Sequence, residues 1–376
     1  MKCKGLSRRT TLKRLTVLHV DTERGWRGGE RQALWLAREL ERRGHRSIVA
    51  ARPGQPLATR ATASGLVVVA CAPLFEADPR AALALRRVMQ HERVDILHAH
   101  TAHAAGLAAL STVGTRVPYV IARRVDFPLR DNVGTRLKYR RAAFVIAVSH
   151  AVERVVERTD VVRGRVLVVP DATDVRRAIV PATAATLAAA GVRDPERALL
   201  VVQVSQLVPH KDPLTFVRAI AAARGRLPNV QAILAGDGPL RGDVQRLCDD
   251  LGLRETLHVL GYRTDADELL AAAKVATLSS REEGMGSVLL DALMLGKPIA
   301  ATDAGGIPEV VEHDVSGLLV PAGDPHALGE AIARILDDET LASRLGAAAR
   351  RRSEQFSVGR MTDRTLEVYE RALATI

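Results

Sequence analysis

The sequence predicts an α/β protein built from two doubly wound, parallel-sheet domains. Short apolar segments alternate with helical patterns along the whole chain, which is typical of parallel α/β folds. Glycine-containing turns follow several of these segments, where a strand would pass into a helix. The chain has 376 residues, which is enough for two domains.

The expected strands fall into two groups with a connection between them. In the first half they are 15–20, 46–51, 66–71, 95–100, 118–123, 143–149 and 165–170. In the second half they are 199–205, 230–236, 257–262, 275–280, 298–302 and 316–321. Residues 181–195 form an Ala/Thr-rich helical segment that suits an interdomain connection. We therefore expect a first domain over 1–181, a second over 182–355 and a final helix over 356–376.

Composition indicates the kind of core and the compartment. The chain is 47% hydrophobic but only 3% aromatic, so its cores must consist mostly of Ala, Val and Leu. Three scattered cysteines, Cys3, Cys71 and Cys248, fit a reducing cytosol and argue against a disulfide frame. No run of about 18 apolar residues indicates a transmembrane helix, and the basic N-terminal segment lacks the apolar stretch of a secretory signal. These features predict a cytoplasmic protein.

The chain is strongly basic, with a formal charge of +11 and a pI of about 10.2. Nucleic acid, an anionic membrane surface, or an arginine-rich composition without a partner would each account for this charge. No aromatic-bearing strand or recognition helix marks a nucleic-acid reader, so we expect no nucleic acid partner. A membrane would attract each nearby basic residue by about 1 kcal/mol, and this interpretation stays open beside the compositional one.

The segment from Ser280 to Val311 is the most informative part of the sequence. Gly284 and Gly286 let the backbone come close to a ligand and leave its amides available. The helix expected to begin near Ser287 points its unpaired N–H groups at the same place, which favours a phosphate. Two carboxylates flank this turn. The combination suits a ligand that carries both a diphosphate and sugar hydroxyls.

The same segment resembles the signature of the retaining glycosyltransferases of family 4, whose GT-B fold has two Rossmann-like domains facing a central cleft. The family pattern places two Glu around a Gly-Phe-Gly turn and follows them with a strand and a Gly-Gly-x-x-Glu turn. Glu283 matches the first Glu, whereas Asp291 replaces the second and Met285 replaces the Phe. A generic phosphate loop of another doubly wound domain is the alternative.

The resemblance implies a role for each of these positions. Glu283 would hold hydroxyls of the donor sugar, and Asp291 would hold the ribose diol. In the resembling fold, the final helix crosses back to pack on the first domain.

A basic residue completes the predicted donor site. The family has a Gly-Arg-Leu-x-x-x-Lys turn, with both Arg and Lys on the donor diphosphate. Lys211 matches the Lys, and a lysine at such a turn reaches phosphate as a point charge. Gln206 stands where the Arg is expected, and a neutral amide cannot replace a bidentate guanidinium. We therefore expect Lys211 and Glu283 to be the catalytic residues.

The remaining donor-side candidates come from neighbouring turns. Gly261 and Tyr262 match the family's region along the nucleotide base, where they would act through backbone groups. Asp265 and Asp267 have the spacing of an Asp-x-Asp metal motif, but we interpret Asp265 as the cap of the following helix, and the family needs no catalytic metal. The donor-binding candidates are Gln206, Gly261, Tyr262, Glu283, Gly284, Met285, Gly286, Ser287 and Asp291.

The acceptor-side candidates lie in the predicted first domain. Gly28 and Gly29 occupy the position of the family's Gly-Gly-x-Glu loop, whose amides approach the donor phosphate and the acceptor. Arg123 and Arg124 replace the acceptor-side His of many relatives. Arginines in a cleft suit an anionic or phosphorylated acceptor, and a salt-bridged pair facing solvent is the alternative. Further basic residues follow at Arg130, Arg136, Lys138, Arg140 and Arg141.

Three nearby histidines raise the question of a metal site. His98 and His100 share one strand face and His103 follows, but no carboxylate or Cys completes a site. The family often has structural histidines here. We therefore predict a structural role and no metal.

These features together predict a retaining glycosyltransferase with a nucleotide-sugar donor and neither metal nor cofactor. The acceptor would be an anionic glycan or lipid-linked molecule of the cell envelope, with peripheral contact to the inner face of the cytoplasmic membrane. Two alternatives remain. One is a nucleotide-sugar-binding protein that has lost turnover, motivated by Gln206 and Asp291. The other is a nucleotide-sugar epimerase of the same fold, which needs an acid/base pair that the sequence does not locate.

Overall fold

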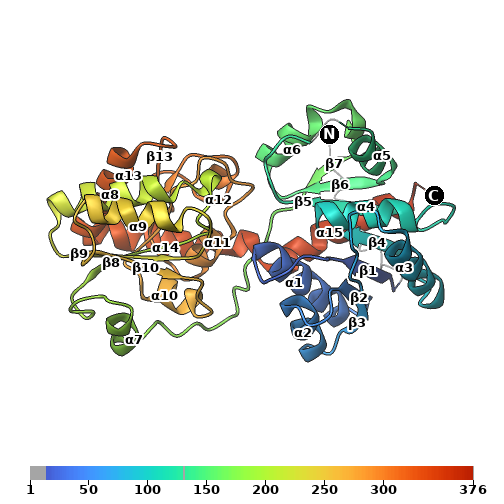
Figure 1. Ribbon diagram of the computed structural model, residues 1–376, viewed down its shortest axis with the longest axis horizontal. Coiled ribbons are helices and arrows are strands. Elements are labelled where there is room, and N and C mark those ends of the chain that lie inside the picture. Colours follow the sequence, from blue (N-terminus) through green and yellow to red (C-terminus); the bar gives the residue numbers. More distant parts are fainter. Residues whose placement is uncertain (1–13, 130–131, 376) are drawn as a thin grey trace, which may run out of the picture. The chain divides into compact units, whose positions relative to one another are not determined.

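The computed structural model describes residues 14–129 and 132–375, and the chain divides into two compact units (Figure 1). The first unit comprises Met1–Ala122, Asp131–Val145 and Leu366–Ile376, and the second comprises Arg123–Arg130 and Ile146–Thr365. Residues 146–181, which the sequence assigns to the first domain, group with the second unit in this division. The basic segment 1–13 and Arg130 lie outside the described residues.

The first sheet has seven strands in the order β3-β2-β1-β4-β5-β6-β7. The pairings of β1 with β2, β1 with β4, β2 with β3 and β4 with β5 are parallel. The strands are β1 (Thr16–Val20), β2 (Arg46–Ala51), β3 (Val67–Ala70), β4 (Ile96–Ala99), β5 (Tyr119–Arg123), β6 (Phe144–Ala147) and β7 (Val166–Val168). Because the strand order reverses between β1 and β4, this is the switch point where doubly wound sheets bind ligands.

The connecting helices begin where polar residues cap them. Asp78, Thr101, Asn132 and Ser149 each accept a hydrogen bond from an amide in the first turn of the helix that follows, which satisfies a backbone donor that the helix itself cannot pair. The helices are α1 (Gly28–Arg42), α2 (Pro56–Ala63), α3 (Pro79–His91), α4 (Ala102–Ser111), α5 (Val133–Arg141), α6 (His150–Glu157) and the 3-10 turn η1 (Asp160–Val162).

The second sheet has six strands in the order β10-β9-β8-β11-β12-β13, and all five pairings are parallel. The strands are β8 (Leu199–Val204), β9 (Val230–Ala235), β10 (Leu257–Gly261), β11 (Val275–Leu278), β12 (Ile299–Thr302) and β13 (Leu318–Val320). Each expected strand is present, with ends shifted by a few residues. The predicted α/β class with two parallel sheets is therefore confirmed.

Helices α8 and α13 of the second half pack against each other and this sheet around an aliphatic core. Phe216 and Ile220 of α8 are buried with Leu328 and Ile332 of α13, and Leu234 lies in the same cluster. The elements are α7 (Ala184–Ala189), η2 (Pro209–Lys211), α8 (Pro213–Arg226), α9 (Arg241–Asp250), α10 (Ala266–Ala272), α11 (Ser287–Met294), α12 (Ile307–Val310), α13 (Pro325–Asp337), α14 (Glu339–Ser353), η3 (Glu354–Phe356) and α15 (Val358–Leu373). Within the described ranges, no helix combines the length and apolarity needed to cross a membrane.

Buried histidines join the first sheet to the last helix. His19 of β1 lies in register with His98 of β4, and its Nδ1 is 3.0 Å from His100 Nε2. His98 Nδ1 is 2.7 Å from the hydroxyl of Tyr369 on α15. The three histidines offer nitrogens within 4.8 Å of one another, but the rings of His98 and His100 stack with centroids 4.0 Å apart. Stacking and hydrogen bonding together tie α15 to the sheet.

The histidine cluster differs from the expected one in two members. His19 joins it from a strand far away in the sequence, whereas His103 is exposed and pairs with Glu23 at 3.3 Å. The alternation of side chains explains this, because His98 of β4 and His100 just after it lie two residues apart on one side of the extended chain, while His103 belongs to α4.

The buried cluster makes stability depend on pH. Burial lowers the pKa of His19 from 6.5 to about 3. Its neighbours are His98 and His100, and burial raises the pKa of Tyr369, which contacts His98. The unfolded chain therefore binds more protons below pH 6.5. His19 contributes fully above that pH, and its contribution is lost at up to about 1.4 kcal/mol per pH unit as pH falls toward 3.

Urea unfolding at pH 7 and pH 5 tests this expectation. His19→Asn keeps a polar atom near the position of Nδ1 but does not titrate in this range. The variant should lose less stability than the wild type between the two pH values. Equal losses would show that His19 does not carry the pH dependence.

Candidate functional site

The predicted donor turn lies at the carboxyl end of β11 in the second unit. Glu283 is buried, and Gly286 adopts a left-handed conformation with φ 79° at the start of α11. No side chain caps α11 at this position. The Leu289 amide bonds to the Gly286 carbonyl at 2.8 Å, so Ser287 and Val288 carry the amides that this helix N-terminus would offer to an anion.

Lys211 and Glu283 are brought together. Lys211 ends the η2 turn after β8, and its ammonium forms an ion pair with the Glu283 carboxylate. The two side chains are only 19% and 10% exposed, so the pair is screened less than a surface salt bridge. Ser280 Oγ adds a hydrogen bond of 3.2 Å to the same carboxylate oxygen. The sequence places these residues 72 positions apart, and the fold joins them because β8 and β11 are neighbours.

The backbone of this turn is fixed by two residues that sequence reasoning missed. Asp126 accepts a hydrogen bond of 2.8 Å from the Glu283 amide, and Ser149 Oγ donates one of 2.6 Å to the Gly284 carbonyl. Gly306 of the second glycine turn donates to the Glu283 carbonyl at 2.8 Å. Asp126 follows β5 and Ser149 follows β6. Their position at the ends of parallel strands was the one signal that could have identified them.

Glycines are needed in the two turns of the site because backbone carbonyl groups of the same chain pass close to them. A Cβ added at Gly284 would overlap the carbonyl oxygen of Arg124, and one added at Gly306 would overlap that of Gly284. At Gly305, the obstacle would be the Glu283 carbonyl. These three positions therefore require glycine for packing of the site.

Met285 and Asp291 point into the protein. Met285 is 3% exposed, and its Sδ accepts a hydrogen bond of 3.2 Å from the Asp171 amide. Asp291 on α11 is 5% exposed and accepts one of 3.0 Å from Thr173 Oγ1. Ser287 opens α11 beside them. The carboxylate of Asp291 is thus held by a neighbouring loop in this structure.

The nucleotide-side candidates lie on turns at the ends of β8, β9 and β10. The Gly236 amide donates to the Gly261 carbonyl at 2.8 Å, while Gln206 and Tyr262 are exposed. The capping role expected of Asp265 is wrong. Asp265 occupies the N-cap position of α10, but its side chain makes no cap hydrogen bond and instead pairs with Arg263 at 2.6 Å, which lowers the pKa of this aspartate.

The acceptor-side candidates are held by local contacts. Gly28 and Gly29 begin α1 in the first unit, where Glu30 accepts from the Arg27 amide at 2.7 Å in a capping box. Arg123 donates to the Phe127 carbonyl. Arg124 is 17% exposed and pairs with Asp171 at 3.1 Å, so this arginine is salt-bridged and mostly buried.

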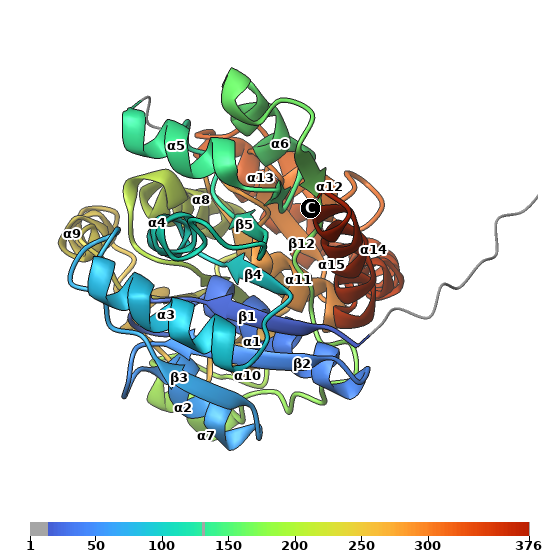
Figure 2. The ribbon, with the colours of Figure 1, turned by 90° about the vertical axis from the view of Figure 1, so that its right-hand side faces the viewer.

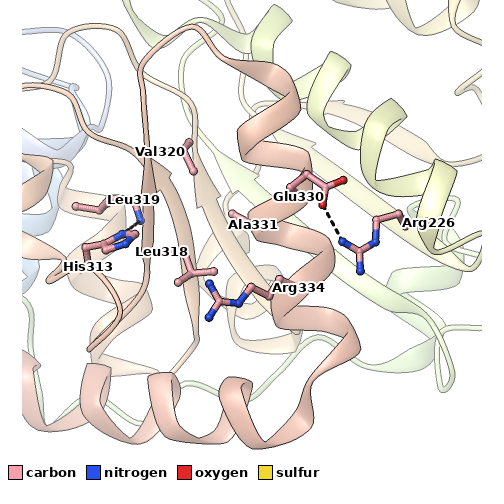
Figure 3. A pocket seen from close by; sticks show the side chains of 8 residues that line it. All are labelled: Arg226, His313, Leu318, Leu319, Val320, Glu330, Ala331 and Arg334. Atoms are coloured by element: carbon pink, nitrogen blue, oxygen red, sulfur yellow. Dashed lines mark hydrogen bonds and ion pairs between the residues drawn. The ribbon is translucent and has the colours of Figure 1, made fainter.

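A cavity of about 450 Å³ lies elsewhere in the second unit, beside the edge strand β13 (Figure 3). Arg226 and Arg334 line it, with Glu330 pairing to Arg226 at 2.7 Å. His313 Nδ1 accepts from the Leu319 amide of β13. None of the predicted site residues lines this cavity, so we do not assign the donor to it.

Two family models match the chain. Glycosyltransferase Family 4 matches residues 26–177, and Glycosyl transferases group 1 matches residues 189–352. The chain is 32% identical over 189 residues to the lipopolysaccharide core biosynthesis glycosyltransferase LpsD of Rhizobium meliloti, a match covering 50% of this chain and 54% of LpsD. It is 27% identical over 307 residues to N-acetyl-alpha-D-glucosaminyl L-malate synthase of Bacillus anthracis, covering 76% and 77%. The chain thus spans about half the length of the Rhizobium relative.

Solved structures show the same fold. Anabaena Alr3699/HepE, crystallised in complex with UDP, matches with a TM-score of 0.80 at 22% identity, over 96% of this chain and 100% of that one. The order of elements, the two parallel sheets and the paired family models agree on one assignment: the chain belongs to the family 4, group 1 glycosyltransferases and has the GT-B fold.

Proposed function

We propose that the chain is a retaining glycosyltransferase that moves a sugar from a nucleotide-sugar donor to an anionic glycan or glycolipid of the cell envelope, without a catalytic metal. The observation that carries this proposal is the contact of Lys211 with Glu283 beside the N-terminus of α11. Structures of Alr3699/HepE with UDP and with UDP-glucose support a nucleotide-sugar donor. The name of the Rhizobium relative supports an envelope acceptor.

The main chemical task is to stabilise charge on the leaving group. As the bond from the sugar to the nucleoside diphosphate breaks, negative charge develops on the departing phosphate. The Lys211 ammonium and the amides of the first turn of α11 would stabilise this charge. Glu283 would accept hydrogen bonds from the donor sugar hydroxyls. From the family resemblance we infer that the acceptor attacks the sugar on the same face from which the nucleoside diphosphate leaves, through an oxocarbenium-like centre.

Before the donor binds, Lys211 and Glu283 neutralise each other. An incoming diphosphate would draw the ammonium away from the carboxylate. Glu283 would then be available to the sugar hydroxyls. The ion pair is therefore the resting state of the proposed site.

The acceptor side belongs to the same proposal. Gly28, Gly29, Arg123 and Arg124 remain its candidates, and because Arg124 is paired with Asp171, an anionic acceptor would have to compete with that carboxylate. The formal charge of +11 supports peripheral contact with an anionic membrane. Electrostatic binding of this kind should weaken as salt rises, because charge pairing is screened within about 8–10 Å.

Incubation with a panel of sugar nucleotides, with and without a chelator, tests the proposal. Transfer to an added acceptor, or slow release of nucleoside diphosphate, in the presence of the chelator is the expected result. Binding without turnover would favour the impaired donor-binding protein suggested by Gln206. An isomerised donor would favour the epimerase. Activity that disappears with the chelator would contradict metal independence.

The length of the Asp291 side chain offers a separate test of the donor site. If Asp291 contacts the ribose, Asp291→Glu should keep or tighten nucleoside diphosphate affinity, measured by calorimetry. Asp291→Ala should weaken it by about 1.5–3 kcal/mol, the value of a hydrogen bond to a charged group. Thr173→Val is the control, because it removes the hydroxyl that donates to Asp291 and keeps the carboxylate. If this variant loses as much affinity as Asp291→Ala, the aspartate acts only by holding the Thr173 loop.

A further inference from the structure

One face of the first unit combines exposed apolar residues with basic ones. It consists of α3, α4 and α5 with the loop between β3 and α3, and we call it the α3–α5 face. Helix α4 packs between α3 and α5, as Figure 2 shows. Six of the large apolar side chains exposed in the described part of the first unit lie here, namely Leu74, Phe75, Leu83, Leu110, Val133 and Leu137, and exposed Val113 follows the end of α4.

Helix α5 shows apolar residues on its solvent side. Val133 and Leu137 are 83% and 56% exposed, and Arg136 and Arg140 are exposed on the same helical face because the four positions follow i, i+3, i+4 and i+7 spacing. The buried side carries Tyr139. A helix serving only to cover the sheet would expose polar residues here, so this face is suited to a second apolar medium.

Helix α3 repeats the same arrangement. Arg80, Leu83 and Arg87 are exposed along one face, while Leu85 and Met89 are buried against the unit. Both helices therefore present aliphatic groups between arginines.

The loop between β3 and α3 holds two apolar side chains outward. Leu74 and Phe75 are 80% and 60% exposed. The loop is nevertheless fixed, because the Leu74 amide donates to Asp78 at 3.1 Å and Glu76 pairs with Lys138 of α5. Glu76 also lies against α4 at Gly106, where an added Cβ would come within 2.8 Å of it. Such a fixed apolar tip, in a unit whose helices α3 and α5 expose further apolar side chains, indicates an interaction surface.

The charges on this face identify the partner. Helices α3 and α5 together carry seven basic residues and no acidic one: Arg80, Arg86, Arg87, Arg136, Lys138, Arg140 and Arg141. Lys138 is only 12% exposed and is paired with Glu76, so we do not count it as a headgroup contact. Basic residues beside Leu, Val and Phe are the composition that binds the interface of an anionic bilayer, with arginines at the headgroups and apolar side chains at the acyl boundary.

We propose that the α3–α5 face docks on an anionic lipid bilayer, with Leu74, Phe75, Val133 and Leu137 entering the interface. This deepens the membrane contact of the proposed function, but it adds a component that net charge alone does not supply. Attraction between arginines and lipid headgroups is screened by salt, whereas burial of apolar side chains is not. Binding should therefore have a salt-sensitive part and a salt-resistant part.

Vesicle co-sedimentation of the full chain tests the proposal without any need for transfer activity. Vesicles of phosphatidylcholine with and without phosphatidylglycerol are compared at low and high salt. We expect binding to the anionic vesicles that persists in part at high salt. The double variants Leu74→Ser/Phe75→Ser and Val133→Ser/Leu137→Ser should each lower the high-salt binding constant roughly tenfold or more. Val180→Ser/Val315→Ser is the matched control, since these exposed valines belong to the second unit and should have no effect.

Two further measurements complete the design. A tryptophan introduced by Phe75→Trp should shift its emission to shorter wavelength when anionic vesicles are added. If both apolar double variants bind anionic vesicles at high salt as tightly as the wild type does, the proposal is wrong. So would an unchanged vesicle affinity together with a change from dimer to monomer in sedimentation, because the face would then bind a second copy of this chain. Donor hydrolysis is assayed separately without vesicles, so failure of the glycosyltransferase proposal is distinguished from failure of this one.

Discussion

Lys211→Ala should lower kcat for sugar transfer by about 10²–10³, the scale expected when one preorganised group that stabilises the leaving charge is removed. The substitution removes the cation that neutralises Glu283 and leaves that carboxylate paired only with Ser280 among the contacts described. Donor hydrolysis or transfer, measured at saturating donor, gives kcat directly. Folding should be preserved, because Lys211 ends a surface turn and is not part of an apolar cluster.

Lys274→Ala is the matched control for this experiment. Lys274 is an exposed lysine of the same unit, next to the amino end of β11, whereas Glu283 follows the carboxyl end. Its removal changes the net charge equally and should leave kcat unchanged. Equal activities of the Lys211→Ala and Lys274→Ala proteins would remove the role assigned to Lys211.

Gly284→Ala should reduce transfer about a hundredfold or more and destabilise the fold by about 1–3 kcal/mol. The added Cβ would overlap the Arg124 carbonyl oxygen, so the turn or the loop after β5 must move, at the usual cost of overpacking. Glu283 precedes this position and its amide is held by Asp126. Displacement of a positioned group by about 1 Å can cost 10²-fold in rate, so activity should fall further than stability.

The control is Gly225→Ala in α8, where an added Cβ meets no atom within 4 Å. Alanine is the better helix former, so this variant should be more stable than the wild type by about 0.5–1 kcal/mol. Thermal unfolding and transfer assays on the two variants separate the effect of the methyl group from its location. If Gly284→Ala keeps full activity, the close approach of the Arg124 carbonyl is not needed for the site.

The strands could be predicted because burial on both faces of a parallel sheet requires continuous apolar segments. β2 has its predicted bounds, and β13 is shorter than predicted, because its first residues form a turn that bonds to His313. Helix starts were equally readable where Asp or Ser caps them. Asp265 shows the limit of this rule, since an arginine two residues earlier competes for the same carboxylate.

The two central residues of the site could be predicted only from their match to a family motif, and not from their contact with each other. Lys211 and Glu283 were singled out by resemblance, and the structure joins them. Asp126 and Ser149 could not be found in this way, because their partners lie 157 and 135 residues away and each looks like an ordinary turn or cap residue. The exposed apolar residues of the α3–α5 face were hidden for another reason. From the sequence alone, a leucine on a helix is expected to lie in the core. Only the fold shows which side of the helix packs against the rest of the protein.

The ion pair of Lys211 and Glu283 has a thermodynamic consequence for ligand recognition. In the proposed site, a nucleoside diphosphate that took the ammonium would leave a mostly buried carboxylate without its cation, and a sugar that took the carboxylate would leave the ammonium in the same condition. When only one of the two ligands binds, the free energy of leaving one charge of the pair without its partner weakens binding. When both bind, each charge has a new partner. By linkage, each must raise the affinity of the site for the other by the same factor. Nucleoside diphosphate should therefore bind more tightly when the free donor sugar is present, and this cooperativity should disappear in Lys211→Ala.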